Sequence, residues 1–398
     1  MRPLNLLALA SVPALLAACG GQTTTGSTSV AATPAGNVQP IQVGSGPANN
    51  MVDGLLTSVT ICVPNTSDCQ TISGIQIDTG SVGLRILSSQ VSLTLPRISA
   101  ANGDPLGNCA AFADLSYAWG PMATADVKMA NETAASVPIQ LLGTPAFPGA
   151  PRLCSQGGTA ANSLTSLGAN GLLGIGVFRQ DCGPACSGSP SSAPAIYFSC
   201  PNSTCSVTSV PLQNQLQNPV WLFPQDNNGV LIQLPSVPAT GTSTLSGSLI
   251  FGIGTRANNA LGGARVYMTD GNGELTTTFR GSAYPSYLDT GSDGLFFLDD
   301  STTGLPACPG EDSGYYCPPA TVAYTATNTG NNGTLAQVSF SIANAETLFQ
   351  TGHVAFDNLG GPNSGEFDWG LPFFLGRSTF IGIEEQNSPA GAGPFFAY

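Results

Sequence analysis

Charged side chains are scarce in this chain, because Asp, Glu, Lys and Arg together make up only 8% of its 398 residues. Ten residues are basic and 23 are acidic, which gives a net charge of −13 at pH 7. Nucleic acids and anionic membrane surfaces bind proteins through clustered Lys and Arg side chains, and this chain has few of either. We therefore expect no nucleic-acid partner.

Histidine occurs once, as His353. This count excludes a metal site that is built on several His ligands. A Ser-His-Asp or Cys-His hydrolase would have to use His353 as its base. The residue stands at the predicted start of a strand, so it is interpreted as structural, and we expect no metal and no cofactor.

Long apolar runs are confined to the start of the chain, so no later segment is predicted to span a bilayer. Arg2 precedes a mostly apolar stretch from Leu4 to Leu16, which is the pattern of an export signal. Residues 16–20 read Leu-Ala-Ala-Cys-Gly and resemble a bacterial lipobox, in which the Cys becomes the lipidated first residue. The alternative is an ordinary cleaved signal that lies beside a Cys.

The lipobox predicts a signal peptide over 1–18 and a palmitate-bearing lipoprotein that Cys19 anchors in the bacterial cell envelope. The protein would then touch the bilayer only through this lipid and face the periplasm or the cell surface. Gly20, in place of an Asp, favours the outer membrane. Residues 19–50 contain no charged residue and many Thr, Ser, Gly and Ala, which predicts a flexible tether.

The body of the chain is longer than the usual single domain, and we expect two lobes, 51–225 and 226–398. It is rich in Thr, Ser, Val and Gly, a composition that is typical of strands and turns and predicts a mainly all-β fold. Few helices are expected, and one candidate is 341–350 with Ser341 as its N-cap. We expect a monomer.

Cysteine usage agrees with export, because the chain has 11 Cys and the removal of Cys19 leaves an even number. A four-thiolate zinc site is the alternative for the four Cys between 182 and 205. Disulfides are favoured because an exported chain meets an oxidising compartment. The expected pairs are Cys62–Cys69, Cys109–Cys154, Cys182–Cys186, Cys200–Cys205 and Cys308–Cys317.

A seven-residue phrase occurs twice with a single change, as Asp-Thr-Gly-Ser-Val-Gly-Leu at 78–84 and Asp-Thr-Gly-Ser-Asp-Gly-Leu at 289–295. Two chance copies of its first four residues have a probability of roughly 1 in 50,000. Each copy follows one apolar residue and leads into an apolar run. At a similar distance downstream, each half also has two apolar residues and a Gly, at 172–174 and 374–376. The repeats predict two half-sites that bring two carboxylates together.

These paired motifs resemble those of pepsin-like aspartic proteases, from about residue 50 to the C-terminus. The resemblance implies a bilobal pepsin-like acid-protease fold, with Asp78 and Asp289 as the catalytic pair and a cleft between two duplicated β-lobes. It implies that 172–174 and 374–376 thread the two Asp turns, and that Tyr117 and Trp119 belong to a flap over the cleft. With its signal, the chain looks like an uncharacterised family of bacterial lipoproteins that carry this body.

The residue types around the two acids fit such a site. Two close carboxylates share one proton, so that one of them can activate a water while the other supports the developing oxyanion. We expect Gly80 and Gly291 to allow the close approach. The other supporting residues are the threonines, which would tie the turns together, and the serines, which would bond the outer carboxylate oxygens: Thr79, Thr290, Ser81 and Ser292.

The leading hypothesis is therefore an envelope-anchored aspartic endopeptidase that binds an extended peptide or protein substrate. A catalytically inactive lipoprotein that binds peptide or glycan is the alternative, and a purely structural envelope lipoprotein is a third.

The sequence leaves the roles of two further residues near the site open. Arg85 stands where the family usually has an aromatic and is taken to face solvent rather than to pair with an acid near the cleft. Asp293 is interpreted as a solvated loop charge.

Overall fold

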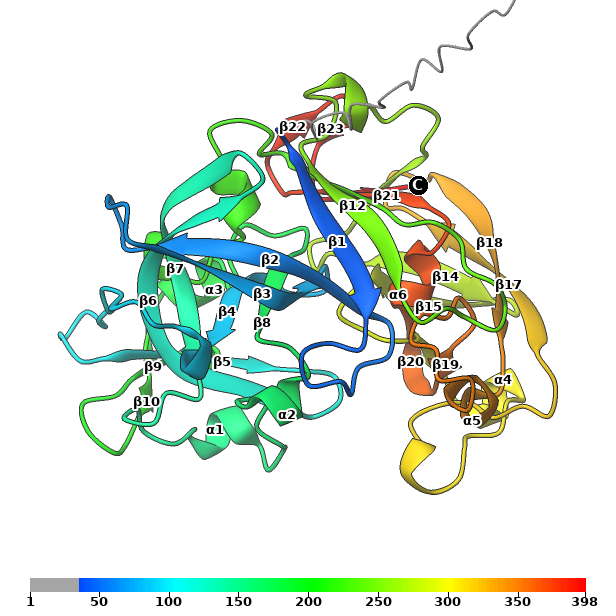
Figure 1. Cartoon of the computed structure of the whole chain (residues 1–398), viewed down its shortest axis with the longest axis horizontal. Coiled ribbons are helices and arrows are strands. Elements are labelled where there is room, and N and C mark those ends of the chain that lie inside the picture. The colour runs from blue at the N-terminus through cyan, green and yellow to red at the C-terminus, as the bar shows by residue number, and fades with distance from the viewer. Residues whose placement is uncertain (1–35) are drawn as a thin grey trace, which may run out of the picture. The chain divides into compact units, whose positions relative to one another are not determined.

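The computed structural model describes residues 36–398. The predicted signal peptide, Cys19 and the first part of the predicted tether lie outside this range. Within it, no helix combines the length and the apolar character that a membrane crossing requires. The described chain is mainly β with a few short helices, and its strands form two lobes with a connecting layer between them (Figure 1). This is the architecture that the paired motifs imply.

The first lobe and the connecting layer share one 15-stranded sheet. The strands of the first lobe are β2 (Gly54–Cys62), β3 (Cys69–Asp78), β4 (Val82–Leu87), β5 (Leu106–Ala111), β6 (Tyr117–Met129), β7 (Glu132–Leu142), β8 (Gly171–Ile175), β9 (Tyr197–Ser199) and β10 (Ser206–Val207). The strands of the connecting layer are β1 (Val38–Gly44), β11 (Gly229–Gln233), β12 (Leu245–Phe251), β13 (Val266–Met268), β21 (Ser378–Gly382) and β24 (Phe395–Ala397).

The second lobe has a seven-stranded sheet of its own. Its strands are β14 (Leu275–Phe279), β15 (Ser282–Leu288), β16 (Leu295–Leu298), β17 (Val322–Thr329), β18 (Leu335–Ile342), β19 (Gly360–Gly361) and β20 (Asn363–Trp369). The short pair β22 (Asn387–Ser388) and β23 (Gly391–Ala392) is separate.

Helices are single turns. The α-helices are α1 (Arg152–Ser155), α2 (Leu164–Leu167), α3 (Pro184–Ser187), α4 (Asp300–Thr303), α5 (Ala345–Phe349) and α6 (Leu371–Phe374). The 3-10 turns are η1 (Ser88–Gln90), η2 (Leu212–Asn214), η3 (Pro219–Leu222), η4 (Ala257–Asn259) and η5 (Gly310–Asp312).

The expected tether over 19–50 is wrong for its last part, because residues 38–44 form strand β1. This strand pairs with β12 from the second half of the chain and with β2 from the first half (Figure 1). Ile41 and Val43 are buried and alternate with the exposed residues Pro40 and Gln42, so the segment has the period of a half-buried strand. β1 therefore helps to hold the two halves of the body together.

The expected helix at 341–350 is shorter than predicted. Residues 335–342 form β18, which takes Ser341 into the sheet, and α5 begins at Ala345. Asn344 caps α5, since its side chain accepts a hydrogen bond from the Thr347 N–H. The pairing of β18 with β17 along its whole length overrides the local helical pattern.

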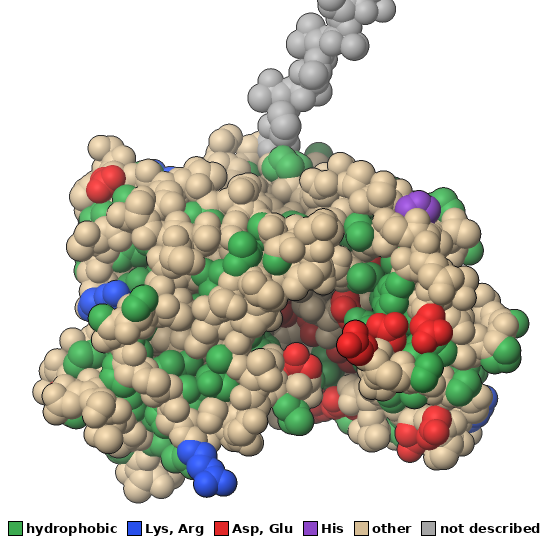
Figure 2. Space-filling view, turned by 60° about the horizontal axis from the view of Figure 1, so that its bottom comes forward, with side chains coloured by type: hydrophobic (Ala, Val, Ile, Leu, Met, Phe, Trp, Pro, Cys, Tyr) green, Lys and Arg blue, Asp and Glu red, His purple; other side chains and the backbone are tan. Residues whose placement is uncertain are grey.

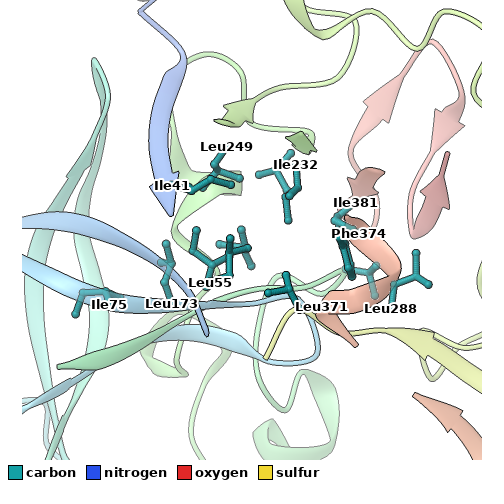
Figure 3. Close-up of a cluster of buried hydrophobic side chains, with 14 of the residues drawn as sticks. Ile41, Leu55, Ile75, Leu173, Ile232, Leu249, Leu288, Leu371, Phe374 and Ile381 are labelled. Carbon is teal, nitrogen blue, oxygen red and sulfur yellow. The ribbon is translucent and has the colours of Figure 1, made fainter. Parts of the chain in front are cut away.

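An apolar core runs through both lobes and the connecting layer. Ile41, Ile232 and Leu249 meet from three neighbouring strands, and the core continues through Leu371 and Phe374 of α6 (Figure 3). Fully burying one Leu, Ile or Phe side chain stabilises a fold by about 1.5–3 kcal/mol. This shared core fixes the platform from which the two Asp turns project.

All five expected disulfides are present, and they connect the pairs that the spacing of the Cys suggested. Cys182–Cys186 and Cys200–Cys205 use the four thiols of the alternative zinc site. That alternative is therefore wrong, because a disulfide sulfur cannot serve as a thiolate ligand.

Candidate active site

Each Asp-Thr-Gly-Ser phrase forms the turn between two strands. Asp78 ends β3, and β4 begins at Val82, whereas Asp289 directly follows β15, and β16 begins at Leu295. The two turns come from different lobes and meet at the bottom of a cleft. The duplicated phrase thus brings two carboxyl groups together, as the sequence predicted.

The two threonines tie the turns to each other. The Thr79 hydroxyl donates to the Leu288 carbonyl over 2.8 Å, and the Thr290 hydroxyl donates to the Ile77 carbonyl over 2.9 Å. Each hydroxyl oxygen also accepts the backbone N–H of the opposite threonine, at 3.0 and 3.2 Å. Both threonines are buried, so these four bonds are shielded from water and fix the relative position of the acids.

Backbone N–H groups hold the inner oxygens of the two acids. The Gly80 N–H donates to Asp78 Oδ1 over 2.8 Å and to Asp289 Oδ1 over 3.1 Å. The Gly291 N–H donates to Asp289 Oδ1 over 2.7 Å. Because one N–H reaches both carboxyl groups, the two acids are close enough to share a proton.

The serines reach the outer oxygens, as the sequence predicted. The Ser81 hydroxyl lies 2.5 Å from Asp78 Oδ2, and the Ser292 hydroxyl lies 3.0 Å from Asp289 Oδ2. Burial, the charge of Asp78 and the hydrogen bond that protonated Asp289 donates to Asp78 raise the pKa of Asp289 to about 8. The pair therefore retains one proton well into the neutral range.

The predicted threading segment is present in the first half and misplaced in the second. Strand β8 runs beside the first turn, with Gly174 opposite Asp78 and Gly83. In the second half this place belongs to residues 368–370 (Asp-Trp-Gly), because Trp369 pairs with both Leu288 and Leu295. Phe374 instead ends helix α6, and Leu375 forms an isolated bridge with Leu234, directly after β11 of the connecting layer. The sequence pattern required two apolar residues before the Gly, and the true segment has an Asp at the first position.

The two residues that the resemblance assigned to a flap lie in the hairpin of β5 and β6, and neither of them lines the cleft. Trp119 is 4% exposed, packs on Phe147 and Phe198, and donates its indole N–H to the Pro148 carbonyl. Tyr117 packs against the same cluster, since residues two apart on a strand share a face. The hairpin tip lines the cleft instead, through Phe112, Ala113, Asp114 and Ser116.

The cleft is a cavity of about 410 Å³ between the hairpin tip and the two turns. Among the described residues, no Lys, Arg or His lines it. Acidic side chains gather in and around this hollow (Figure 2). The acids that line it are Asp78, Asp114, Asp289, Asp293 and Asp368.

Comparison with known protein families assigns the chain to one of them. Residues 33–398 match the family described as "Protein of unknown function (DUF3443)". The chain belongs to this family. Among the solved structures, it is similar to an aspartic proteinase from Irpex lacteus, with 13% sequence identity and a TM-score of 0.49, over 90% of this chain and 96% of that chain. No curated protein matches.

In this member of the DUF3443 family, two acids of the cleft were not predicted as site residues. Asp368 is 4% exposed and lies 2.5 Å from the Ser292 hydroxyl. Asp293 is not the solvated loop charge that the sequence suggested, because it lines the cleft and accepts a hydrogen bond from the Tyr315 hydroxyl over 2.7 Å. Burial raises the pKa of Asp293 to about 6. In the sequence, the only sign that Asp368 belongs to the site is its position directly before Trp369-Gly370.

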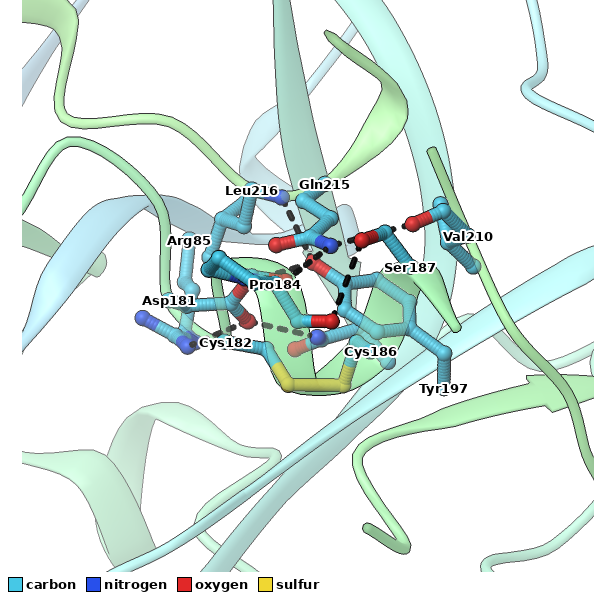
Figure 4. Close-up of a disulfide and its surroundings, with 12 residues drawn as sticks. Arg85, Asp181, Cys182, Pro184, Cys186, Ser187, Tyr197, Val210, Gln215 and Leu216 are labelled. Carbon is cyan, nitrogen blue, oxygen red and sulfur yellow. Dashed lines mark hydrogen bonds and ion pairs between the residues drawn. A yellow bond between two sulfur atoms is a disulfide. The ribbon is translucent and has the colours of Figure 1, made fainter. Parts of the chain in front are cut away.

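Arg85 does not face solvent, because all six residues of β4 are buried. Its guanidinium donates to the Val82 carbonyl over 2.8 Å and lies 3.9 Å from the Asp181 carboxylate (Figure 4). Asp181 also accepts the Tyr197 hydroxyl at 2.5 Å, next to the Cys182–Cys186 disulfide. This buried ion pair supports the strand that follows the first Asp turn.

Proposed function

We propose that this protein is an aspartic endopeptidase of the bacterial envelope, in which Asp78 and Asp289 activate a water molecule to hydrolyse extended peptides. One observation carries the proposal: the Gly80 N–H donates to an inner oxygen of both acids, from turns that the threonines lock together. A strand–turn device at a lobe interface has no need to bring two carboxyl groups into one buried place, where they repel each other when both are ionised.

The reaction would proceed through the shared proton. The ionised member of the pair takes a proton from the water, and the water oxygen attacks the scissile carbonyl carbon. The protonated member, which we assign to Asp289, donates a hydrogen bond to the carbonyl oxygen as negative charge develops there. The proton taken from the water then passes to the leaving nitrogen, so that the pair regains its single proton.

The substrate would lie extended in the cleft, under the tip of the β5–β6 hairpin. An extended peptide can add its backbone hydrogen bonds to exposed strand edges while its side chains enter pockets on alternate sides. The cleft and both acids come from a single chain, which agrees with action as a monomer.

We further propose that the lipid on Cys19 holds this body at the envelope. The five disulfides support an oxidising compartment.

A cleavage screen tests this function. Protein lacking residues 1–19 would be incubated with a peptide library between acid and neutral pH, and the products would be identified by mass spectrometry. The double variant Asp78→Asn/Asp289→Asn serves as the blank. New termini that appear with the wild type alone would support the peptidase. No cleavage at any pH would overturn it, and retained binding of the same peptides would then identify a binding protein.

The acidic cleft should also select substrates by charge. We expect peptides with Lys near the scissile bond to have a kcat/KM about tenfold higher than matched peptides with Glu, because every charged side chain that lines the cleft in the described part of the chain is acidic. The preference should grow as pH rises through about 6, where Asp293 ionises, and should shrink in high salt. Competition between matched Lys, Gln and Glu peptides measures it. Asp293→Asn should reduce the ratio, and an equal rate for Lys and Glu peptides would contradict the prediction.

A further inference from the structure

A single hydroxyl stands between two acids in the second half of the site. Ser292 Oγ lies 3.0 Å from Asp289 Oδ2 and 2.5 Å from Asp368 Oδ2. A serine hydroxyl has one proton, so it can donate to only one of these oxygens. If Ser292 donates to Asp289, the short contact with Asp368 requires a proton on Asp368.

The surroundings of Asp368 favour that proton. The residue is 96% buried on strand β20, and its Oδ1 has no hydrogen-bond partner. Among the described residues, no Lys, Arg or His forms an ion pair with it. The titratable groups that act on it come from the two turns, from β15 and from its own strand: Asp78, Asp289, Tyr287 and Glu366. An unpaired carboxylate in such a place costs far more free energy than the neutral acid does.

The first half of the site has no equivalent. Asp368 pairs with Tyr287 and Phe296, which lie two residues before and seven residues after Asp289. Leu172 occupies the same place beside the first turn, where it pairs with Gln76 and Arg85. The Ser81 hydroxyl consequently bonds to one acid only. The site is therefore asymmetric at this one position.

We propose that Asp368 is a third acid of the site and acts as a positioning residue. It keeps a proton on Oδ2 and uses it to donate a hydrogen bond to Ser292 Oγ, which directs the Ser292 hydroxyl to Asp289. The role rests on the proposed function and concerns the pH range of that same site. Burial and the charge of Asp289 raise the pKa of Asp368 well above its usual value, in agreement with this geometry.

The consequence appears when the pH rises. Asp368 then releases its proton to solvent, and the Ser292 hydroxyl turns to the new carboxylate. Asp289 loses a donor to its outer oxygen and gains a negative neighbour, and both changes strengthen its hold on its own proton. The three acids thus titrate as one unit, and the last proton leaves the catalytic pair at a higher pH than it would without Asp368.

The pH profile of kcat tests this role. We expect Asp368→Asn and Asp368→Leu to move the alkaline limb to lower pH by about one unit, because a like charge this close shifts a carboxyl pKa by about 1–3 units. Ser292 can still donate to Asp289 in both variants on the acid side, so the shift of each alkaline limb is measured from the acid-side plateau of the same variant. The two replacements differ in polarity, so a merely structural role would separate them. Asp293→Asn, which removes a cleft acid whose carboxylate bonds to the Tyr315 hydroxyl and not to the Ser292 hydroxyl, should move the limb less.

Infrared spectroscopy gives a readout that does not need turnover. At neutral pH the protonated-carboxyl band of the wild type should be stronger than that of both Asp368 variants by the contribution of one carboxyl group, because protonated Asp289 contributes to the band in all three proteins. Far-UV circular dichroism checks the folding. A band of equal intensity in wild type and variants would overturn the assignment, as would an unmoved alkaline limb in an active enzyme. A band that loses the intensity of one carboxyl group in the Asp368 variants of a protein that cleaves nothing would support the third acid while the proposed peptidase fails.

Discussion

Asp289→Asn is expected to lower kcat/KM for peptide cleavage by about 10³–10⁴-fold, and Asp78→Asn by a similar factor. An amide at either position can neither take the proton from the water nor hold the shared proton. The hydrogen bonds from Gly80 and Gly291 to the inner oxygen can persist in both variants, so the turn itself should survive. The exposed acid Asp68 offers a matched control, and Asp68→Asn should retain full activity.

Asp289→Asn should make the folded protein more stable at neutral pH while it abolishes most of the activity. The pKa of Asp289 is raised in the folded state to about 8 from an ordinary value of 3.8. A raised folded-state pKa contributes stability that is fully present below about pH 4 and is lost as the pH rises through about 8. Asn has no proton to lose, so at pH 7 we expect Asp289→Asn to raise the free energy of unfolding by roughly 1–3 kcal/mol.

Thermal unfolding at pH 4 and pH 7, alongside the cleavage assay, separates the two effects. Lower activity with an equal or higher melting temperature at pH 7 means that chemistry was lost and the fold was kept. Wild-type activity in either Asn variant would exclude the acid pair as the catalytic centre. A collapse of the melting temperature at both pH values would contradict the assignment of a raised pKa.

Local repetition made part of this site predictable from the sequence. The two Asp-Thr-Gly-Ser phrases identify the acids together with the Thr, Gly and Ser residues that hold them, because the whole constellation lies within four residues of each acid. Close spacing also identified disulfides such as Cys62–Cys69, since short loops leave few other partners. The mainly β, two-lobed fold followed from composition and from the duplication.

The parts that were missed depend on long-range packing. Arg85 seemed free to face water because a single strand does not reveal that both of its faces are covered, as they are for β4. Tyr117 and Trp119 are consecutive on one face of β6, and only the fold shows that Phe198 covers that face. Asp368 is far from Asp289 along the chain, and its position beside Ser292 arises only when β20 pairs with β15.

Substitution of the glycines in the two turns is the other change with a large expected effect on activity. At each glycine, the carboxyl group of the opposite acid occupies the space that a Cβ would need. A Cβ at Gly80 would lie 2.6 Å from Asp289 Cγ, and a Cβ at Gly291 would lie 2.8 Å from Asp78 Cγ. These distances are shorter than any tolerable contact, so Gly80→Ala and Gly291→Ala must push the opposite acid away. Misplacement of a reacting group by about 1 Å costs on the order of 100-fold in rate.

We therefore expect Gly80→Ala and Gly291→Ala to lower kcat about 100-fold or more, and to destabilise the fold by about 1–3 kcal/mol through overpacking. Gly271→Ala is the matched control, because a Cβ there meets no atom within 4 Å, and it should change neither quantity. The alkaline limb of the pH profile should also move to lower pH in the two turn variants, since separated carboxyl groups repel less and release the shared proton more readily. Turn variants with the wild-type rate and pH profile would mean that the catalytic step does not require the close approach of Asp78 and Asp289.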